Sequence, residues 1–211
     1  MTILDEIEEY RRRVLIAHWA AFNCISHAPT KGRMRERVIS SLLNEEYGIS
    51  TVSGIACDED GIWQSPEIDI ICLRNNARRG TPGIYHLEEI VAECEVKSDA
   101  ASSDFQSTEI AAAKIKEHSW GSIITTMFCF ATHAQRKTVC GYFGFQYDIG
   151  IKAFNTYDPT KDSCAHIDHF LSLDASNTEQ PFLITKDTSG QRNLMIGGRP
   201  IERFFKLFQP L

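Results

Sequence analysis

The chain has 211 residues, of which 43% are hydrophobic and 24% charged, and its 28 acidic and 22 basic side chains give a formal net charge of −6. This composition is ordinary for a soluble globular protein, and the length predicts one domain, residues 1–211, with a sizeable core. No apolar run approaches the ~20 residues that cross a membrane, and no signal-peptide pattern opens the chain, so we expect a cytoplasmic protein without a membrane partner. The net charge argues against a protein that coats nucleic acid but permits an enzyme with a local basic path.

The seven cysteines are scattered along the chain, and none belongs to a C-x-x-C pair. Most of them lie in apolar runs, which is typical of buried thiols in a reducing compartment. We therefore expect no zinc site.

The N-terminal part of the chain is predicted to be helical. Apolar residues recur at spacings of three and four, which predicts one amphipathic helix over residues 3–26, within an N-terminal segment 1–30. Pro29 is expected to break this helix.

A second helix is expected over residues 32–47, where Gly48 would end it. Glu36 lies at the margin of the apolar stripe of this helix, so its carboxylate could reach into a cleft. Its other interpretation is a solvated helix glutamate near Arg33 and Arg37.

Strand patterns follow in the middle of the chain. Residues 49–57 read as a strand that an acidic turn closes, and residues 68–73 and 90–97 read as two more strands. The segment 75–83 is polar, basic and rich in turn-forming residues, so it is expected to be a loop.

The strands 68–73 and 90–97 carry charges that apolar strands rarely hold. Alternation places Asp69 on the opposite face from Ile68, Ile70 and Cys72. In the second strand, Glu93, Glu95 and Lys97 point away from Ile90, Ala92, Cys94 and Val96. A carboxylate in an apolar strand is costly unless it is paired or binds a metal. We therefore expect Asp69, Glu95 and Lys97 to cluster at one edge of a mixed sheet.

Such a cluster has a chemical use. Two carboxylates can hold Mg²⁺, which prefers few protein carboxylates together with water and phosphate oxygens. The metal lowers the pKa of a bound water, and a neighbouring lysine can orient that water or stabilise charge that develops on phosphorus. The alternative is a surface salt bridge on two edge strands, and the sequence leaves it open.

The remainder of the chain alternates helix and strand patterns. A helix capped by Asp104 is expected to run to His118, and the apolar run 123–131 suits a strand covered on both faces. Further strands are expected at 170–174, 182–186 and 194–196, followed by an end helix at 199–208. His166, Asp168 and His169 are weak metal candidates because no partner ligands accompany them.

The order of these motifs resembles the NucC-type branch of the PD-(D/E)XK nuclease superfamily. The resemblance rests on K-G-x-x-x-E at 31–36, V-S-G-I-A-C-D at 52–58, S-P-E-I-D at 65–69 and E-V-K at 95–97, and it covers residues 30–100 best. It implies an α/β fold with a restriction-endonuclease-like core, a mixed central sheet flanked by helices. The core would span residues 30–135, and residues 136–211 would extend the sheet and add the end helix.

The resemblance also implies a function, an Mg²⁺-dependent endonuclease of bacterial anti-phage defence in which Mn²⁺ can replace Mg²⁺. Asp69, Glu95 and the Val96 carbonyl would bind the metal, Lys97 would position or activate water, and Glu36 would be the third acid. DNA is favoured over RNA as the substrate by resemblance alone. The residues expected to bind its phosphates are Lys31, Arg33, Arg74, Arg78 and Arg79.

The resemblance also bears on binding partners, but this chain lacks two residues that the family uses to bind a cyclic trinucleotide. NucC-type enzymes that bind a cyclic trinucleotide use an arginine soon after the second helix and an aromatic residue after the first acidic strand. This chain has no arginine between Leu42 and Asp69 and no aromatic residue between Asp69 and Thr81. A homo-oligomer is expected, whereas a cyclic-nucleotide activator stays an open question. Two alternatives to an enzyme also stay open: a nuclease-like sensing domain, and a subunit active only within a larger complex.

Overall fold

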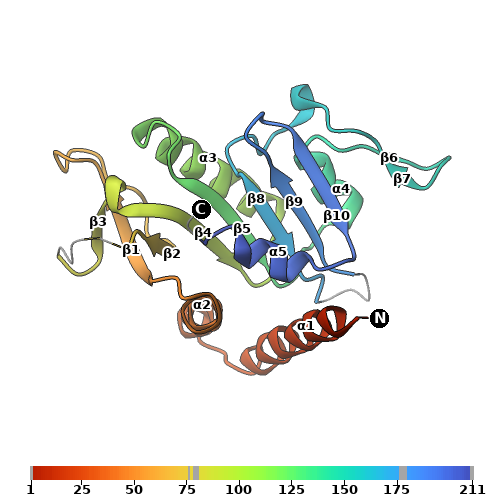
Figure 1. Cartoon of the computed structure of the whole chain (residues 1–211), viewed down its shortest axis with the longest axis horizontal. Helices are drawn as coiled ribbons and strands as arrows, with labels where there is room; N and C mark the ends of the chain where they lie inside the picture. Colours follow the sequence, from red (N-terminus) through yellow and green to blue (C-terminus); the bar gives the residue numbers. More distant parts are fainter. Residues whose placement is uncertain (1, 76, 78–80, 176–179, 210–211) are drawn as a thin grey trace.

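The computed structural model describes residues 2–75, 77, 81–175 and 180–209. Its main feature is an eight-stranded mixed sheet with the strand order β10-β9-β8-β5-β4-β2-β1-β3 (Figure 1). The strands are β1 (Thr51–Cys57), β2 (Ile68–Leu73), β3 (Ile84–His86), β4 (Ile90–Lys97), β5 (Ile124–Cys129), β8 (His169–Ser172), β9 (Phe182–Lys186) and β10 (Arg192–Ile196). A separate hairpin of β6 (Tyr147–Asp148) and β7 (Ala153–Phe154) projects from the body of the molecule.

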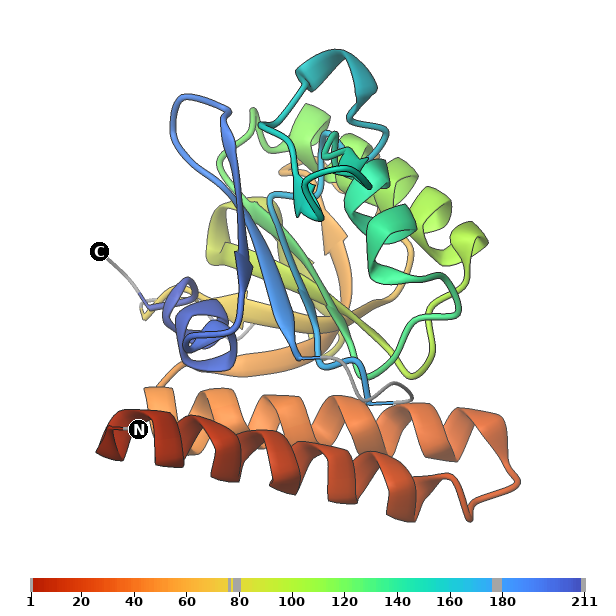
Figure 2. The same ribbon diagram turned by 90° about the vertical axis from the view of Figure 1, so that its right-hand side faces the viewer.

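Helices flank this sheet, as Figure 2 shows: α3 and α4 lie on one side, α5 lies on the other, and the α1–α2 hairpin runs along the base. The helices are α1 (Ile3–Phe22), α2 (Ala28–Tyr47), α3 (Ser102–His118), α4 (Arg136–Tyr142) and α5 (Pro200–Lys206), with short 3₁₀ turns η1 (Leu87–Glu89) and η2 (Pro159–Lys161). The expected α/β class, a mixed central sheet flanked by helices, is confirmed.

The two N-terminal helices have different bounds from those expected. Thr2 caps α1 through a reciprocal pair of hydrogen bonds with Asp5, and the helix ends at Phe22, four residues early. Helix α2 begins at Ala28 because the His27 side chain caps it, and Pro29 lies in its first turn. A proline is tolerated there, since the first-turn N–H groups have no helical partner. Pro29 thus helps to start α2.

The strand predictions hold best in the centre of the sheet. The expected bounds of the strands 68–73 and 90–97 are those of β2 and β4. The sequence missed β3, the hairpin β6–β7 and α4. Helix α4 has seven residues, which is too short for a helical apolar period to stand out.

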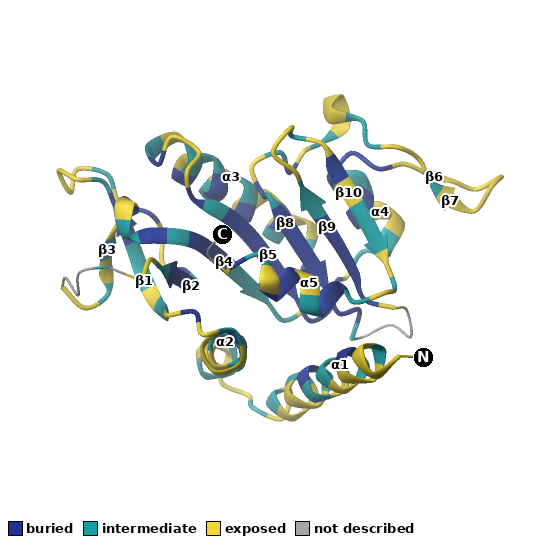
Figure 3. Ribbon diagram, in the orientation of Figure 1, coloured by how far each residue is buried: buried dark blue, intermediate teal, exposed yellow. Residues whose placement is uncertain are grey.

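Two large apolar clusters pack against the sheet, and the central strands are almost wholly buried (Figure 3). The first cluster joins side chains of α1, α2 and α5 to one face of β2, β4, β5 and β8. The second joins α3 and α4 to the other face of β5, β8 and β9. All seven cysteines are free; six are buried, and Cys24 is exposed.

A buried carboxylate ties α1 to the last helix. Glu8 is only 6% exposed, and its two oxygens accept hydrogen bonds from the backbone N–H groups of Ile201 and Glu202 at 2.6 and 3.0 Å. These donors lie at the start of α5, where N–H groups lack helical partners. The contact therefore closes the first helix onto the last one described. No helix in the described part of the chain is long and apolar enough to cross a membrane.

Candidate active site

The candidate site lies where β2 begins and β4 ends. These strands pair antiparallel, with Ile70 opposite Cys94 and Ile71 opposite Glu93, so the same register sets Asp69 opposite Glu95. The Val96 N–H donates a hydrogen bond of 2.8 Å to Asp69 Oδ2. Directly opposed side chains have Cβ atoms ~5 Å apart, which is close enough for two carboxylates to share one cation.

This pair of strands lies inside the sheet rather than at its margin. Strand β4 has β5 on its other side, and β2 has β1. The expectation of a cluster at the sheet edge was therefore wrong in that respect. The charged residues gather at one end of two interior strands, where flanking segments can enclose them.

Lys97 joins the carboxylates at this end. Its Nζ lies 2.5 Å from Glu95 Oε1 and 3.9 Å from Asp104 Oδ1, the latter in the first turn of α3. Burial disfavours the charged ammonium, but Glu95, Asp69 and Asp104 outweigh that effect and raise the pKa of Lys97. The lysine is therefore a cation at neutral pH, suited to donating hydrogen bonds and stabilising negative charge.

Asp69 is the most perturbed of the expected ligands. Burial, followed by the charge of Glu95, raises the pKa of Asp69 to about 7, although the Val96 N–H and Lys97 act in the opposite direction. Two neighbouring carboxylates that resist joint ionisation gain stability from a bound cation. The donor set therefore fits a divalent metal.

Glu36 approaches the same site from α2. It is partly buried, and burial together with Glu67 and Glu95 raises its pKa, whereas Arg33 and Lys97 lower it. The helix thus brings a further carboxylate into the electrostatic field of the strand residues.

A cavity of about 180 Å³ adjoins these residues, between β2, β4 and α3. Glu93, only 5% exposed, lines it with Glu95, and burial raises the pKa of Glu93 well above the ordinary value. Thr108 of α3 also lines the cavity, and its buried hydroxyl has no hydrogen-bond partner within the described structure. The E-C-E spacing had placed Glu93 on the face of Glu95, but the sequence assigned it no role.

Alternation of faces fails at one position in each of these two strands. Ile68, expected on the side of Ile70, lines the cavity with Glu95. Ile90 belongs to an apolar cluster that includes Ile71 rather than Ala92. For Ile90 the cause is a shift in the β2–β4 register between Cys72 and Leu73, since a bulge changes which residues share a face.

The carboxylates are not assembled as a finished metal cage. Among the described residues, no three His, Cys, Asp or Glu side chains are grouped so that they could hold a metal ion. Glu95 is paired with Lys97, and Asp69 with a backbone N–H. Mg²⁺ tolerates such a sparse set, because it keeps several waters and takes one or two carboxylates.

The expected phosphate-binding residues are dispersed. Lys31 and Arg33 lie on the first turns of α2, before Glu36, and Arg33 is exposed. Arg74 follows the far end of β2, ~16 Å along the strand from Asp69, and its Nε donates to the Glu88 carbonyl at 2.8 Å. The structure does not bring Arg74 to the carboxylates. Arg78 and Arg79 lie outside the described residues.

The weak metal candidates near residue 168 have structural partners. His166 Nδ1 contacts Glu109 Oε1 at 2.6 Å, and Asp168 forms an ion pair with Lys116. Burial lowers the pKa of His169 to about 4, so its ring is neutral at pH 7. These side chains tie α3 and β8 together.

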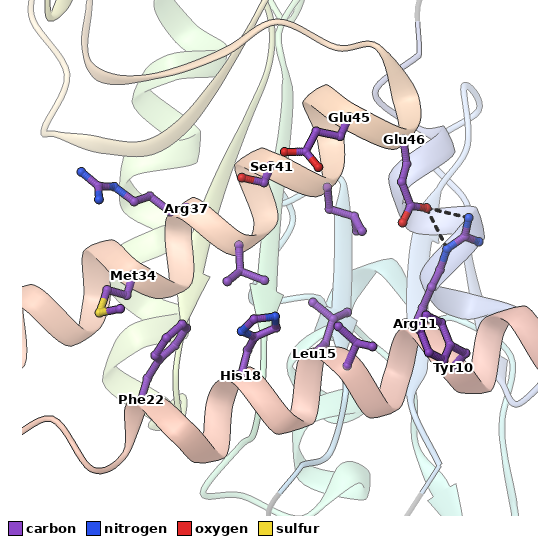
Figure 4. Close-up of a pocket in the computed structure, with 13 residues that line it drawn as sticks. Tyr10, Arg11, Leu15, His18, Phe22, Met34, Arg37, Ser41, Glu45 and Glu46 are labelled. Atoms are coloured by element: carbon purple, nitrogen blue, oxygen red, sulfur yellow. Dashed lines mark hydrogen bonds and ion pairs between the residues drawn. The ribbon is translucent and has the colours of Figure 1, made fainter.

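A larger cavity, about 500 Å³, lies between α1 and α2 (Figure 4). Apolar side chains such as Leu15, Phe22 and Met34 line it, and an ion pair of 2.7 Å between Arg11 and Glu46 crosses one end. It lacks opposed carboxylates with an adjacent lysine, so the strand site is the candidate active site although this cavity is larger.

No protein-family model matches the chain, and no curated protein sequence does. Solved structures do match it. The cAAA-bound forms of NucC from E. coli MS115-1 and from P. aeruginosa ATCC27853 each give a TM-score of 0.69 at 14% identity, covering 99% of this chain and 90% of theirs. The apo form of the E. coli MS115-1 protein gives 0.61 at 12% identity over the same shares. Along nearly its whole length, the chain therefore has the fold of the NucC structures.

Proposed function

We propose that this protein is a metal-dependent endonuclease that hydrolyses phosphodiester bonds in double-stranded DNA. The observation that carries the proposal is the opposition of Asp69 and Glu95 across β2 and β4 with Lys97 beside them. The NucC fold supports the same assignment.

Each residue has a task in this reaction. Asp69 and Glu95, with the Val96 carbonyl, would hold Mg²⁺ or Mn²⁺, which supplies a more acidic bound water and neutralises phosphate charge. Lys97 donates a hydrogen bond to the attacking water or to a phosphate oxygen as negative charge develops. Glu36 would hold a further water or a second cation. The water loses a proton as its oxygen attacks phosphorus in line, the opposite P–O bond breaks and its oxygen gains a proton, and the products are a phosphate monoester and a hydroxyl end.

The surroundings of the site favour an extended polyanion. Lys31 and Arg33 precede Glu36 on α2 and form a local basic segment on an otherwise acidic chain. Phosphate contacts of this kind bind without reading sequence. The preference for DNA is part of the proposal and comes from the likeness to NucC.

Plasmid DNA, single-stranded DNA and RNA, each offered with Mg²⁺, Mn²⁺, Ca²⁺ or excess chelator, test this function. We expect cleavage of duplex DNA with Mg²⁺ or Mn²⁺, none in chelator, and little or none with Ca²⁺, whose looser coordination suits binding without turnover. Undiminished cleavage in chelator would place the chemistry elsewhere. DNA binding without cleavage under every metal, with cAAA present as well as absent, would favour the sensing alternative.

Control by a small molecule belongs to the same proposal. Two of the structural neighbours are cAAA-bound forms, and we propose a role in anti-phage defence with a cyclic oligonucleotide as activator of a cytoplasmic homo-oligomer. Cleavage should then rise when cAAA is added, and size-exclusion with light scattering should give a mass above one chain. Equal cleavage with and without cAAA would remove the activator from the proposal.

A further inference from the structure

The strand that carries Glu95 and Lys97 ends against the α1–α2 hairpin. Ser98 directly follows Lys97, and its hydroxyl accepts a hydrogen bond from Arg35 Nη1 of α2. Its carbonyl accepts another, 3.0 Å long, from Trp19 Nε1 of α1. Two helices thus hold the residue next to the proposed catalytic lysine.

Arg35 is placed at an energetic cost. It is only 3% exposed, and its Nε has no hydrogen-bond partner in the described structure. Its Nη2 donates to Asn23 Oδ1 at 2.8 Å, and Asn23 caps the C-terminal end of α1. Its hydrogen bonds go to neutral oxygens, and burial lowers the pKa of Arg35 while the charge of Asp99 offsets this only partly, so the buried guanidinium contributes little net stability. We therefore interpret Arg35 as a residue that holds Ser98 and Asn23 in place.

That geometry reaches the site by two routes. Through Ser98, Arg35 fixes the exit of β4, while the Phe130 N–H holds the Lys97 carbonyl at 3.0 Å. Through α2, it fixes Glu36, the next residue, whose carboxylate interacts with Glu95 and Lys97. A helical turn is rigid, so anchoring one residue sets its neighbour.

We propose that Arg35, together with Ser98 and Trp19, is a positioning residue that fixes Lys97 and Glu36 relative to each other for phosphodiester hydrolysis. This inference rests on the proposed nuclease function. Misplacing a catalytic group by about 1 Å can cost ~10²-fold in rate, so the contact is worth detecting kinetically.

Four variants test it. Arg35→Met keeps the bulk and removes the donors, Ser98→Ala removes the hydroxyl acceptor, and Trp19→Phe removes the indole N–H. The matched control is Arg37→Met, an exposed arginine on the same helix that lies along the α1–α2 groove (Figure 4). We expect kcat to fall ~10–100-fold for Arg35→Met and less for Ser98→Ala and Trp19→Phe, with KM within about two-fold and the control unchanged.

A second readout does not need turnover. Mn²⁺ affinity is measured by calorimetry for Arg35→Met, for Glu36→Gln and for the double variant. We expect each single change to weaken Mn²⁺ binding ~10-fold and the double change to add little to either, because both act through the Glu36 carboxylate. A purely structural arginine would instead give additive losses or none.

The outcomes separate the inference from the function. A wild-type protein that neither binds Mn²⁺ nor cuts with Mg²⁺ overturns the nuclease proposal and this inference with it. A wild type that cuts while Arg35→Met and Ser98→Ala cut equally fast overturns the positioning role alone. If Arg35→Met fails to fold, Ser98→Ala decides, since it removes one hydrogen bond with little change of volume.

Discussion

The two faces of β2 and β4 are built from alternate residues of the same strands, yet they have opposite properties. On one face, Ile70, Cys72, Ala92 and Cys94 are completely buried beneath side chains from α2 and α5. On the other face, Asp69, Glu93, Glu95 and Lys97 meet at a small cavity under α3 and at the strand ends. The first face has no charge to accommodate, and the second has four ionisable groups.

This contrast shows how a sheet can hold mutually repelling carboxylates. Burial and like charge raise the pKa values of Asp69 and Glu93, so the charged face loses stability whenever both ionise. Packing on the apolar face supplies the compensating free energy and fixes the backbone from which the carboxylates project. Removing a buried side chain from the apolar face should therefore destabilise the fold, whereas neutralising a carboxylate on the charged face should stabilise the metal-free protein.

The largest expected effect comes from the apolar face. Ile70→Ala removes a fully buried side chain beside Asp69, and we expect the free energy of unfolding to fall by about 2–4 kcal/mol. Urea titration of the metal-free protein measures the loss. A loss below about 1 kcal/mol would mean that this face supports the sheet less than its burial implies.

Lys97→Ala tests the charged face. We expect cleavage to fall ~10²–10³-fold with little loss of stability, because the ammonium stabilises charge that develops only during reaction. Asp69→Ala or Glu95→Ala should cost at least as much activity and also weaken Mn²⁺ binding, whereas Lys97→Ala should leave that affinity unchanged or slightly higher. Lys137→Ala, an exposed lysine on α4, is the control.

If the Lys97→Ala variant cleaves DNA at the wild-type rate, Glu95 and Lys97 form only a structural salt bridge. Unfolding of Lys97→Ala would do the same, because a structural ion pair would then explain why Lys97 lies beside Glu95. Circular dichroism alongside the kinetics separates these two results.

Asp69→Asn sharpens the comparison through pH. The raised pKa of Asp69, about 7 when folded, means that its ionisation opposes folding. The stability that the protonated form provides is complete below the unfolded pKa near 4 and is lost as pH rises through about 7. Without metal, Asp69→Asn should therefore be more stable than wild type by about 1–3 kcal/mol at pH 8 and equal to it at pH 4.

Thermal melts across that pH range measure this difference, and Mg²⁺ provides the control. Saturating Mg²⁺ should stabilise the wild type and not the variant, because only the wild type keeps both carboxylates. A difference that is the same at pH 4 and pH 8 would show that Asp69 is not the titrating group.

The smallest expected effect on stability comes from placing a polar atom on the apolar face. Cys94→Ser preserves the shape of a fully buried side chain but adds a stronger hydrogen-bonding group, and we expect it to cost about 1 kcal/mol. Cys94→Ala, compared by urea titration, separates this cost from lost volume. A serine variant more stable than the alanine variant would show that the face tolerates polarity.

The sequence predicted the two strands that carry the candidate site well, because that information is local. Alternation along residues 68–73 and 90–97 identified both strands and the charged residues on them, because a strand's period is visible within six residues. The register of two strands and the approach of α3 depend on tertiary packing. For that reason the cavity at Thr108, the burial of Glu93 and the distance of Arg74 from the site appeared only in the structure.

The helices show the same division. Gly48, with φ of 68°, ends α2 as its sequence predicts, since glycine accepts the left-handed conformation readily. The predicted start of α2 was wrong because a proline such as Pro29 can either break a helix or lie in its first turn. The histidine cap that places Pro29 in the first turn is uncommon, so the sequence did not reveal it. The burial of Arg35 depends on its partners Ser98 and Asn23, which are distant in sequence and therefore do not show in the helix pattern.

The contact of Glu8 with α5 has a consequence for the order of synthesis. Helix α5 contributes Phe204 and Phe205, and Phe208 directly after it, to the cluster that covers the apolar face of β2 and β4, and Glu8 fixes the start of α5. A ribosome releases the N-terminal helices and both strands well before α5. During that interval the carboxylates stand on strands whose supporting face is uncovered. If the protein is the nuclease proposed above, its site becomes rigid only once α5 has been synthesised and has packed against the sheet.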